Sequence, residues 1–391
     1  MSLYLQFVVL GLSAGAVYAA LANGLISIYR ATGILNFGLG ATALWGAYVY
    51  AGIRASGEMT LPVGSVHVGE LAALPALAIA LVTAVVLSLL AHLLIFRPLR
   101  SAPTLAHRII ISPSDGTALA NAVEVAHEND VPVMVYDALI MNSPYVTYYA
   151  TDDLYAVGAT QGKFLVDALG VAEGKGPFNL EIFSGSMTDN NATYFYQGAM
   201  DQLQPYIDNG QLVVKSGQID RTSTTTEKWS ATNAQTRADA ILSTYYSDGS
   251  HLDACLTQND DLAAGVISAC KSAGYGTPEN PLPLTTGQDC NVSAILSIIN
   301  GEQSSTVFKN IKELAYAGAV GIDAMVHGEE IPWDPEMVGT YNNNVVDVTT
   351  YQVRPLLLTI DNWYELIVES GFYDAEDLGM TPEQLAAYAP K

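Results

Sequence analysis

The chain has 391 residues, of which 50% are hydrophobic and 14% are charged, and its 39 acidic residues against 16 lysines and arginines give a net charge of −23. Such an excess of negative charge argues against nucleic-acid binding, which needs lysine and arginine to neutralise phosphates. The length allows more than one domain with its own hydrophobic core.

The charge is divided unevenly along the chain. Residues 1–106 carry six charged side chains with a net charge of +2, so the remainder carries about −25. We therefore predict a membrane region over residues 1–106 and a water-soluble region over residues 108–391. The six charged side chains of the first region are Arg30, Arg54, Glu58, Glu70, Arg97 and Arg100.

Three apolar runs predict transmembrane helices, over residues 3–29, 32–53 and 71–96. Each run reaches the roughly 20 residues that a helix needs to cross a bilayer core. The first run is too long for a cleavable signal peptide and has no basic stretch before it. Arg30 and the arginines after the third run place those two loops in the cytoplasm, with the N-terminus outside.

Two stretches of residues 1–106 carry a resemblance to a known family. They are GLSAGAVYAALANGLISIYRATGILNFGLGATALWGAYV and, after the third run, FRPLRSAPTLA. Residues 1–106 resemble the permease subunits of branched-chain amino-acid ABC transporters. Because complete members of that family have many more spans, the resemblance implies an N-terminal permease fragment in a lipid bilayer.

From residue 108 onward, short β-rich runs alternate with helical runs. This alternation predicts parallel sheets with helices on both faces, hence an α/β fold. The expected strands cover residues 109–112, 131–136, 146–150, 179–183, 212–216, 254–257, 282–286 and 305–308. The expected helices cover residues 117–129, 154–169, 192–207, 233–246, 262–273, 292–299 and 311–327.

Polar residues follow five of these strands, where ligands bind in such sheets. Carboxylates and amides pair with vicinal hydroxyls, and an aromatic face covers the apolar side of a sugar ring. The alternative is that aspartate and asparagine at strand ends only cap helices. The candidates for a sugar site are Asp137, Asp189, Asn191, Trp229, Asn259, Asp289 and Lys309.

A second resemblance covers residues 108–391. The segments VYDALIMNS, GKGPFNLEIFSGSMTDNNATYFYQGAM, KWSATNAQTR, TQNDDLAAG, TTGQD and GEQSSTVFK resemble periplasmic sugar-binding receptors of ABC transporters, of the xylose and multiple-sugar-binding type. The resemblance implies a type I periplasmic-binding-protein fold of two doubly wound lobes. It also implies that Asp137, Asp189, Asn191, Asn259, Asp289 and Lys309 bind hydroxyls and that Trp229 stacks on the ring. Ala138 departs from the arginine usual in that family, which puts the identity of the sugar in question.

The join between the two regions conflicts with a working transporter. The resemblance implies that membrane segments replace the first two β–α units of the N-terminal lobe, which leaves that lobe truncated with an exposed sheet edge. Three spans would also send the receptor region into the cytoplasm, although such receptors work outside it. No flexible linker separates the regions. We therefore expect a chimeric fusion rather than a natural two-domain transporter.

The leading function is the monosaccharide-binding component of a carbohydrate ABC uptake system, impaired by truncation, with xylose, glucose or a similar aldose as ligand and permease and ATPase subunits as partners. The alternative is a permease subunit of a branched-chain amino-acid ABC transporter. The sequence has no P-loop, HExxH or GxGxxG motif, so we expect no enzyme, no cofactor and no metal. Cys255, Cys270 and Cys290 have no metal-ligand spacing. We expect them to be buried small side chains, although a Cys255–Cys290 bridge remains open.

Overall fold

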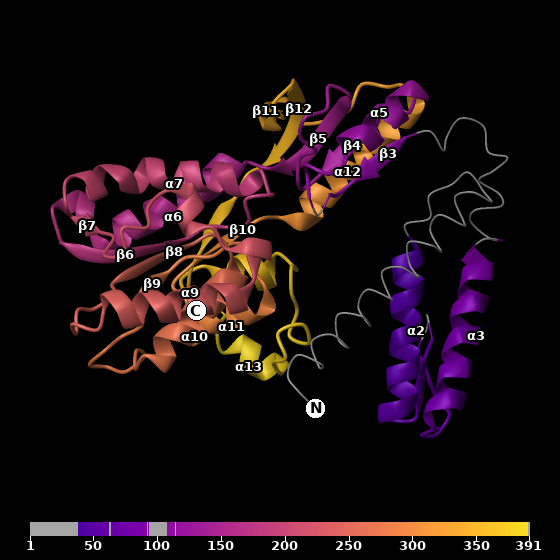
Figure 1. Cartoon of the computed structure of the whole chain (residues 1–391), viewed down its shortest axis with the longest axis horizontal. Coiled ribbons are helices and arrows are strands. Elements are labelled where there is room, and N and C mark those ends of the chain that lie inside the picture. The colour runs from indigo at the N-terminus through magenta and orange to yellow at the C-terminus, as the bar shows by residue number, and fades with distance from the viewer. Residues whose placement is uncertain (1–37, 62–63, 92, 94–107, 114, 390–391) are drawn as a thin grey trace, which may run out of the picture. The chain divides into compact units, whose positions relative to one another are not determined.

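The computed structural model describes residues 38–61, 64–91, 93, 108–113 and 115–389. These residues divide into two compact units on either side of residue 106 (Figure 1). Each unit is described by itself below.

The first unit is a helical pair joined by a short β-hairpin. Helices α2, Gly38–Ala55, and α3, Ala73–Ala91, flank the antiparallel strands β1, Glu58–Thr60, and β2, Ser65–His67. Val49 and Ile53 of α2 pack with Ala76 and Ala80 of α3 in a small buried cluster. The alanines let the two helix backbones approach closely.

Helix α3 exposes most of its apolar side chains. Leu74 is 80% exposed, and Leu81 and Val85 are 59% and 65% exposed. Among the described residues, α3 is the one helix whose length and composition suit a membrane span, over Ala73–Leu90. The expected span 32–53 overlaps α2, which does not meet the same criterion, and the expected span 3–29 lies outside the described residues. The described part of the chain thus contains one candidate span rather than three.

The second unit begins with a five-stranded sheet in the order β11-β12-β5-β4-β3, in which only β11 runs antiparallel to its neighbour. Helix α5 covers one face of this N-terminal lobe and α12 covers the other. The strands are β3, Ile109–Ile111; β4, Val133–Tyr136; β5, Val146–Asp152; β11, Val338–Asn342; and β12, Asp347–Val353; the helices are α5, Ala120–Glu128, and α12, Ile311–His327.

The sequence of β4 shows why this sheet has two buried faces. Val133 and Val135 point to the side of α5, while Met134 between them packs against α12. Successive side chains of a strand point to opposite faces, so a continuous apolar run is what a strand buried on both sides requires. Strand β3 lies at the edge of the sheet, and its Ile109 and Ile110 are 36% and 43% exposed.

The C-terminal lobe holds a parallel sheet in the order β7-β6-β8-β9. Helices α6 and α7 cover one face, where they pack on Leu180 and Ile182, and α9 and α10 cover the other, where they pack on Phe183 and Cys255. The strands are β6, Phe178–Phe183; β7, Leu212–Val213; β8, Ala254–Thr257; and β9, Leu284–Thr285; the helices are α6, Leu154–Leu169; α7, Asn191–Asp208; α9, Ala231–Tyr245; and α10, Asp260–Ser272.

A smaller apolar cluster closes the C-terminal lobe around Trp363, Ile367 and Phe372. Cys290 is buried in this cluster, and all three cysteines are free and buried, so the Cys255–Cys290 bridge is not formed. The elements of this part are α11, Val292–Ile299; β10, Thr306–Phe308; the antiparallel β13, Leu356–Leu358; a π-helix, Tyr364–Glu369; and α13, Pro382–Ala386.

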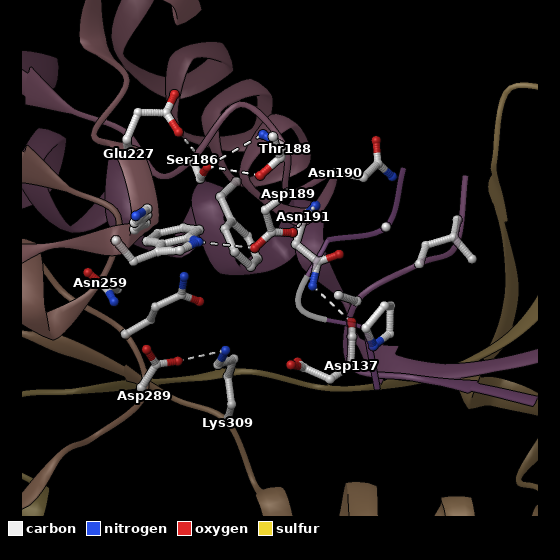
Figure 2. A pocket seen from close by; sticks show the side chains of 18 residues that line it. Asp137, Ser186, Thr188, Asp189, Asn190, Asn191, Glu227, Asn259, Asp289 and Lys309 are labelled. Atoms are coloured by element: carbon white, nitrogen blue, oxygen red, sulfur yellow. Dashed lines mark hydrogen bonds and ion pairs between the residues drawn. The ribbon is translucent and has the colours of Figure 1, made fainter. Parts of the chain in front are cut away.

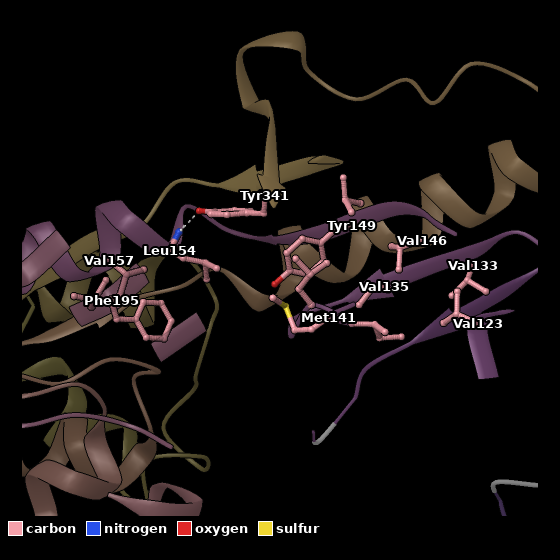
Figure 3. Packing of buried hydrophobic residues seen from close by; sticks show 14 residues of the cluster. Val123, Val133, Val135, Met141, Val146, Tyr149, Leu154, Val157, Phe195 and Tyr341 are labelled. Atoms are coloured by element: carbon pink, nitrogen blue, oxygen red, sulfur yellow. Dashed lines mark hydrogen bonds between the residues drawn. The ribbon is translucent and has the colours of Figure 1, made fainter. Parts of the chain in front are cut away.

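The chain passes three times between the lobes, after β5, after β10 and after β12. One buried cluster continues across these passages, since Leu154, Val157 and Phe195 pack together with Tyr149 and Tyr341 (Figure 3). The Leu154 N–H donates to the Tyr341 hydroxyl at 2.8 Å. The two lobes therefore share a core at the hinge.

The two doubly wound lobes that the sequence predicts are present. Helices α6, α11 and α12 have the predicted bounds, and each predicted strand occurs, although 212–216 shortens to β7. Strands β11, β12 and β13 were not predicted.

Helices α6 and α7 touch through glycines, which brings α7 and its site residues close to the hinge. A Cβ at Gly158 would lie 1.9 Å from the carbonyl oxygen of Phe195, and one at Gly198 would lie 2.1 Å from that of Tyr155. Both atoms belong to backbone, so neither clash is relieved by a rotamer change. These two helices cross at a separation that only glycine permits.

We expect Gly158→Ala to lower the free energy of unfolding by about 2 kcal/mol, because the forced separation of the helices outweighs the roughly 1 kcal/mol that alanine gains in helix propensity. Urea unfolding of the full chain in detergent measures this difference. The control is Thr232→Ala on the exposed face of α9, which should change the value by less than about 0.5 kcal/mol. Equal stability of both variants would contradict the close-contact argument.

Candidate functional site

A cavity of about 670 Å³ opens between the two lobes. All seven residues predicted for the site line this cavity (Figure 2). Carboxyl ends of strands from both lobes meet here, as expected for ligand sites in open α/β sheets. The other lining residues are Pro113, Gly116, Ala138, Leu139, Ser186, Thr188, Asn190, Phe195, Glu227, Lys228 and Gln288.

Asp137 follows β4 and turns out of the sheet with φ 66°. Its N–H donates to Ala150 of β5 at 2.9 Å. Its carbonyl accepts from the Tyr149 hydroxyl, from Thr151 Oγ1 at 2.9 Å and from Asn191 Nδ2 at 2.9 Å. Aspartate tolerates this left-handed conformation better than most residues. The backbone is therefore held on three sides while the carboxylate stays free to face the cavity.

Asp189 and Trp229 hold each other. The indole Nε1–H donates to Asp189 Oδ2 at 3.1 Å, and the Asn191 N–H donates to Asp189 Oδ1 at 2.9 Å. Burial raises the pKa of Asp189, and the nearby Asp137 carboxylate raises it further, while the two hydrogen bonds and Lys309 lower it. Asp189 thus orients the indole and leaves lone pairs for a ligand.

Trp229 reaches its place through an unusual backbone and a close contact. Lys228 and Trp229 both have positive φ, 60° and 53°. A Cβ at Gly185 would lie 2.1 Å from the indole, so this glycine leaves the space that the ring occupies. The Phe195 ring lies 6.3 Å from the Trp229 ring at an interplanar angle of 66°. The two rings form an aromatic wall of the cavity.

Lys309 lies at the passage from β10 to α12 and forms an ion pair with Asp289, with Nζ 2.7 Å from Oδ1 (Figure 2). Burial lowers the pKa of Lys309, but the carboxylates of Asp289, Asp152 and Asp137 outweigh it and raise the pKa above its usual range. The ammonium therefore stays charged and acts as a hydrogen-bond donor in the cavity.

Asp152 ends β5 beside this ion pair and is 2% exposed. Burial raises its pKa to about 7; Lys309 opposes this rise, and the carboxylates of Asp137, Asp289 and Glu313 add to it. Its Oδ1 is buried without a hydrogen-bond partner among the described residues. This carboxyl group belongs to the hinge and not to the cavity lining.

Asn259 shows that capping and binding are compatible. Its Oδ1 caps α10 by accepting from the Leu262 N–H at 3.0 Å, which leaves Nδ2 for the cavity. In contrast, the N-cap side chain of α7 makes no capping bond, and Asn191 instead reaches the carbonyl of Asp137. The capping alternative therefore explains Asn259 only in part.

Of the eleven lining residues that were not predicted, Glu227, Gln288 and Phe195 bear most on the chemistry of the cavity. Glu227 accepts from Ser186 Oγ at 3.0 Å. Gln288 is 2% exposed, and its Oε1 has no hydrogen-bond partner in the described structure. Glu227 and Gln288 stand within two positions of predicted residues, which is a signal that could have included them.

The site offers hydrogen-bonding groups and aromatic surface. The described residues hold no group of three or more histidine, cysteine or acidic side chains placed to bind a metal. Carboxylates and amides beside a Trp–Phe wall suit a polyhydroxylated ring, whose hydroxyls pair with the polar groups and whose C–H face covers an aromatic ring.

Comparisons with known proteins agree with this geometry. Residues 106–330 match the family described as periplasmic binding protein domain. The multiple sugar-binding periplasmic receptor ChvE of Rhizobium radiobacter is 44% identical over 272 residues, 69% of this chain and 75% of that protein. The D-xylose-binding periplasmic protein of Escherichia coli is 30% identical over 270 residues, 69% of this chain and 74% of that protein.

Solved structures show the same fold. A solute binding protein of an ABC transporter from Clostridium phytofermentans with bound beta-D-glucose superposes with a TM-score of 0.66 and 40% identity, covering 70% of this chain and 82% of that chain. A carbohydrate transporter solute binding protein from Chloroflexus aurantiacus in complex with D-glucose gives 0.62 and 32% identity over 71% and 82% of the two chains. The predicted type I periplasmic-binding-protein fold is confirmed.

We expect Asp152→Asn to flatten the pH dependence of stability. Because the folded pKa of about 7 lies above the ordinary value of 3.8, the folded chain keeps a proton that the unfolded chain releases between these pH values. Stability therefore falls as the pH rises through this window, by about 4 kcal/mol at most for this group. Urea unfolding at pH 5 and pH 8 measures the difference. Asp167→Asn, on the exposed face of α6, should keep the wild-type slope, and an unchanged slope in Asp152→Asn would refute the assignment.

Proposed function

The chain belongs to the periplasmic binding protein domain family, and we propose that residues 108–391 are the monosaccharide-binding component of a carbohydrate ABC uptake system. This family consists of binding proteins and not of enzymes. The observation that carries the proposal is the single cavity in which acidic, amide and aromatic side chains from both lobes converge. Relatives named for multiple sugars and for D-xylose, and neighbours holding glucose, support an aldose as the ligand.

In this proposal the seven residues predicted from the sequence bind the sugar in three ways. Trp229 stacks on the apolar face of the ring, and Asp189 keeps the indole in place. Asp137, Asp289, Asn191 and Asn259 bind hydroxyl groups, and Lys309 donates from the hinge. Closure of the two lobes would enclose the sugar, and the closed form would engage permease and ATPase subunits of the transporter.

We propose further that residues 1–106 place the chain at a lipid bilayer, with the receptor region derived from an extracytoplasmic protein. The exposed apolar surface of α3 supports this. The alternative function, a permease subunit for branched-chain amino acids, depends on residues 1–106 alone.

We also propose that the join is a chimeric fusion with a truncated N-terminal lobe. The compact units divide at residue 106, where the family match begins, and β3 beyond it is an edge strand with exposed isoleucines. Sequencing across codons 100–115 in an independent clone tests the fusion; a continuous natural reading frame there would count against it.

Isothermal titration of the full chain in detergent with xylose, glucose, galactose and arabinose tests sugar binding. We expect Trp229→Phe to weaken binding about tenfold, because it removes ring area and the indole donor to Asp189. Trp333→Phe is the matched control, since Trp333 packs on Tyr351 and Tyr148 away from the cavity. No heat of binding with any sugar would refute the proposal, as would equal losses in both variants.

For the membrane region we expect Leu81→Lys combined with Val85→Lys to release the chain from membranes. Each lysine at the centre of a span costs roughly 2.5–3.5 kcal/mol on insertion. The measurement is the share of chain that resists alkaline carbonate extraction. Ile311→Lys, at a residue that is 54% exposed on α12, is the control and should leave the share unchanged. Retention of the doubly charged variant would show that α3 is not an anchor.

A further inference from the structure

The cavity has a surplus of negative charge. Its described lining holds four carboxylates, from Asp137, Asp189, Glu227 and Asp289, against two lysines. Lys309 forms an ion pair with Asp289 at 2.7 Å, Lys228 is exposed, as are Asp137 and Glu227, and the guanidinium of Arg221 interacts with Asp189 and Glu227 from outside the lining. The carboxylates therefore outnumber the cations that can neutralise them.

Asp137, an exposed residue at the mouth of the cavity, is the one of these four whose carboxylate has no hydrogen-bond donor of its own in the described part of the chain. Its carbonyl receives three hydrogen bonds, whereas its carboxylate accepts none from the residues that the structure describes. The next residue, Ala138, also lines the cavity and supplies no charge. Figure 2 shows the Asp137 carboxylate turned toward the side of the cavity where Lys309 and Asp289 lie. The ammonium of Lys309 thus serves the carboxylates of both Asp289 and Asp137.

Gln288 gives an independent sign of a ligand that donates hydrogen bonds. It lines the cavity and is 2% exposed, yet its Oε1 is buried with no donor among the described residues. A buried acceptor without a partner costs roughly 1–3 kcal/mol. A donor group on a bound ligand would remove this cost.

We propose, on the basis of the sugar-binding function proposed above, that the site prefers an amino sugar, a hexose with an ammonium substituent on a ring carbon that pairs with the Asp137 carboxylate. An ammonium group offers three donors and no acceptor, which matches a cavity with more acceptors than donors. A neutral hydroxyl satisfies the same acceptors without neutralising charge. A sugar acid would add a further carboxylate among the four already present.

A metal ion is a poorer match for the same charge. The described residues hold no group of three acidic or histidine side chains arranged for a metal. The Trp229–Phe195 wall would also remain without a partner if the ligand were a bare cation. A sugar ring with a cationic substituent can stack its C–H face on the Trp229–Phe195 wall and pair its cation with a carboxylate of the cavity.

The test is isothermal titration of the full chain in detergent at pH 6 with glucosamine, glucose and glucuronate. We expect glucosamine to bind about tenfold more tightly than glucose, because a charge-assisted hydrogen bond replaces a neutral one. Glucuronate should bind about tenfold more weakly than glucose. Glucose binding as tight as glucosamine, or tighter, would overturn this inference and leave the proposed function standing, and binding of none of the three would overturn both.

Variants locate the preference. Asp137→Asn should reduce the ratio of glucosamine to glucose affinity to about two or less, and Ala138→Arg should lower it to a similar value by placing a guanidinium beside Asp137. Ala138→Met is the control, because it fills similar space without charge and should keep the wild-type ratio. An unchanged ratio in both Asp137→Asn and Ala138→Arg would overturn the assignment to Asp137.

Discussion

The site depends on one ammonium group placed where the lobes meet. Lys309 stands on a passage between the lobes and is surrounded by acidic side chains from three directions: Asp137 after β4, Asp289 after β9 and Asp152 at the end of β5. Burial lowers the pKa of Lys309, and the acidic side chains around it raise the pKa by more, so the ammonium stays charged. Removal of one partner from a buried ion pair costs about 3–5 kcal/mol, because the other charge is left uncompensated. This network therefore fixes the strand ends of both lobes around the cavity.

Close backbone contacts provide the rest of the positioning. Gly158 lets α7 approach α6, so Asn191 at the start of α7 can reach the carbonyl of Asp137 in the other lobe. Gly185 leaves the space in which the Trp229 ring lies. Neither glycine lines the cavity. The positions of Asn191 and Trp229 in the cavity thus depend on two close contacts that leave no room for an added methyl group.

The sequence predicted the alternating elements well because β–α units are local patterns. Helices such as α6 and α12 carry a cap and an apolar periodicity within their own residues. Six of the seven predicted site residues follow a strand, and Trp229 lies in the turn before α9. Strand β11, Val338–Asn342, lacks such a pattern, and it exists because it pairs with β12, which pairs with β5 201 positions earlier in the chain. Gln288 and Phe195 were missed for a related reason. Whether a side chain next to a site residue faces the cavity is decided by tertiary backbone geometry, such as the positive φ of Asp289.

The polar groups of the cavity also explain how a two-lobed receptor can be selective. Asp189 accepts a hydrogen bond from the indole of Trp229, and the Oδ1 of Asn259 caps α10. These bonds fix both side chains, so Asp189 presents its remaining lone pairs and Asn259 its Nδ2 donor to a ligand. Gln288 and Asp137 present acceptors that no described residue satisfies. In the proposed closed form, water would be excluded and every unmatched group would carry its full desolvation cost. A ligand that satisfies all of these groups closes the lobes at little cost, whereas one that leaves a single acceptor unpaired does not. Discrimination between similar rings then follows from the groups left unpaired rather than from the contacts made.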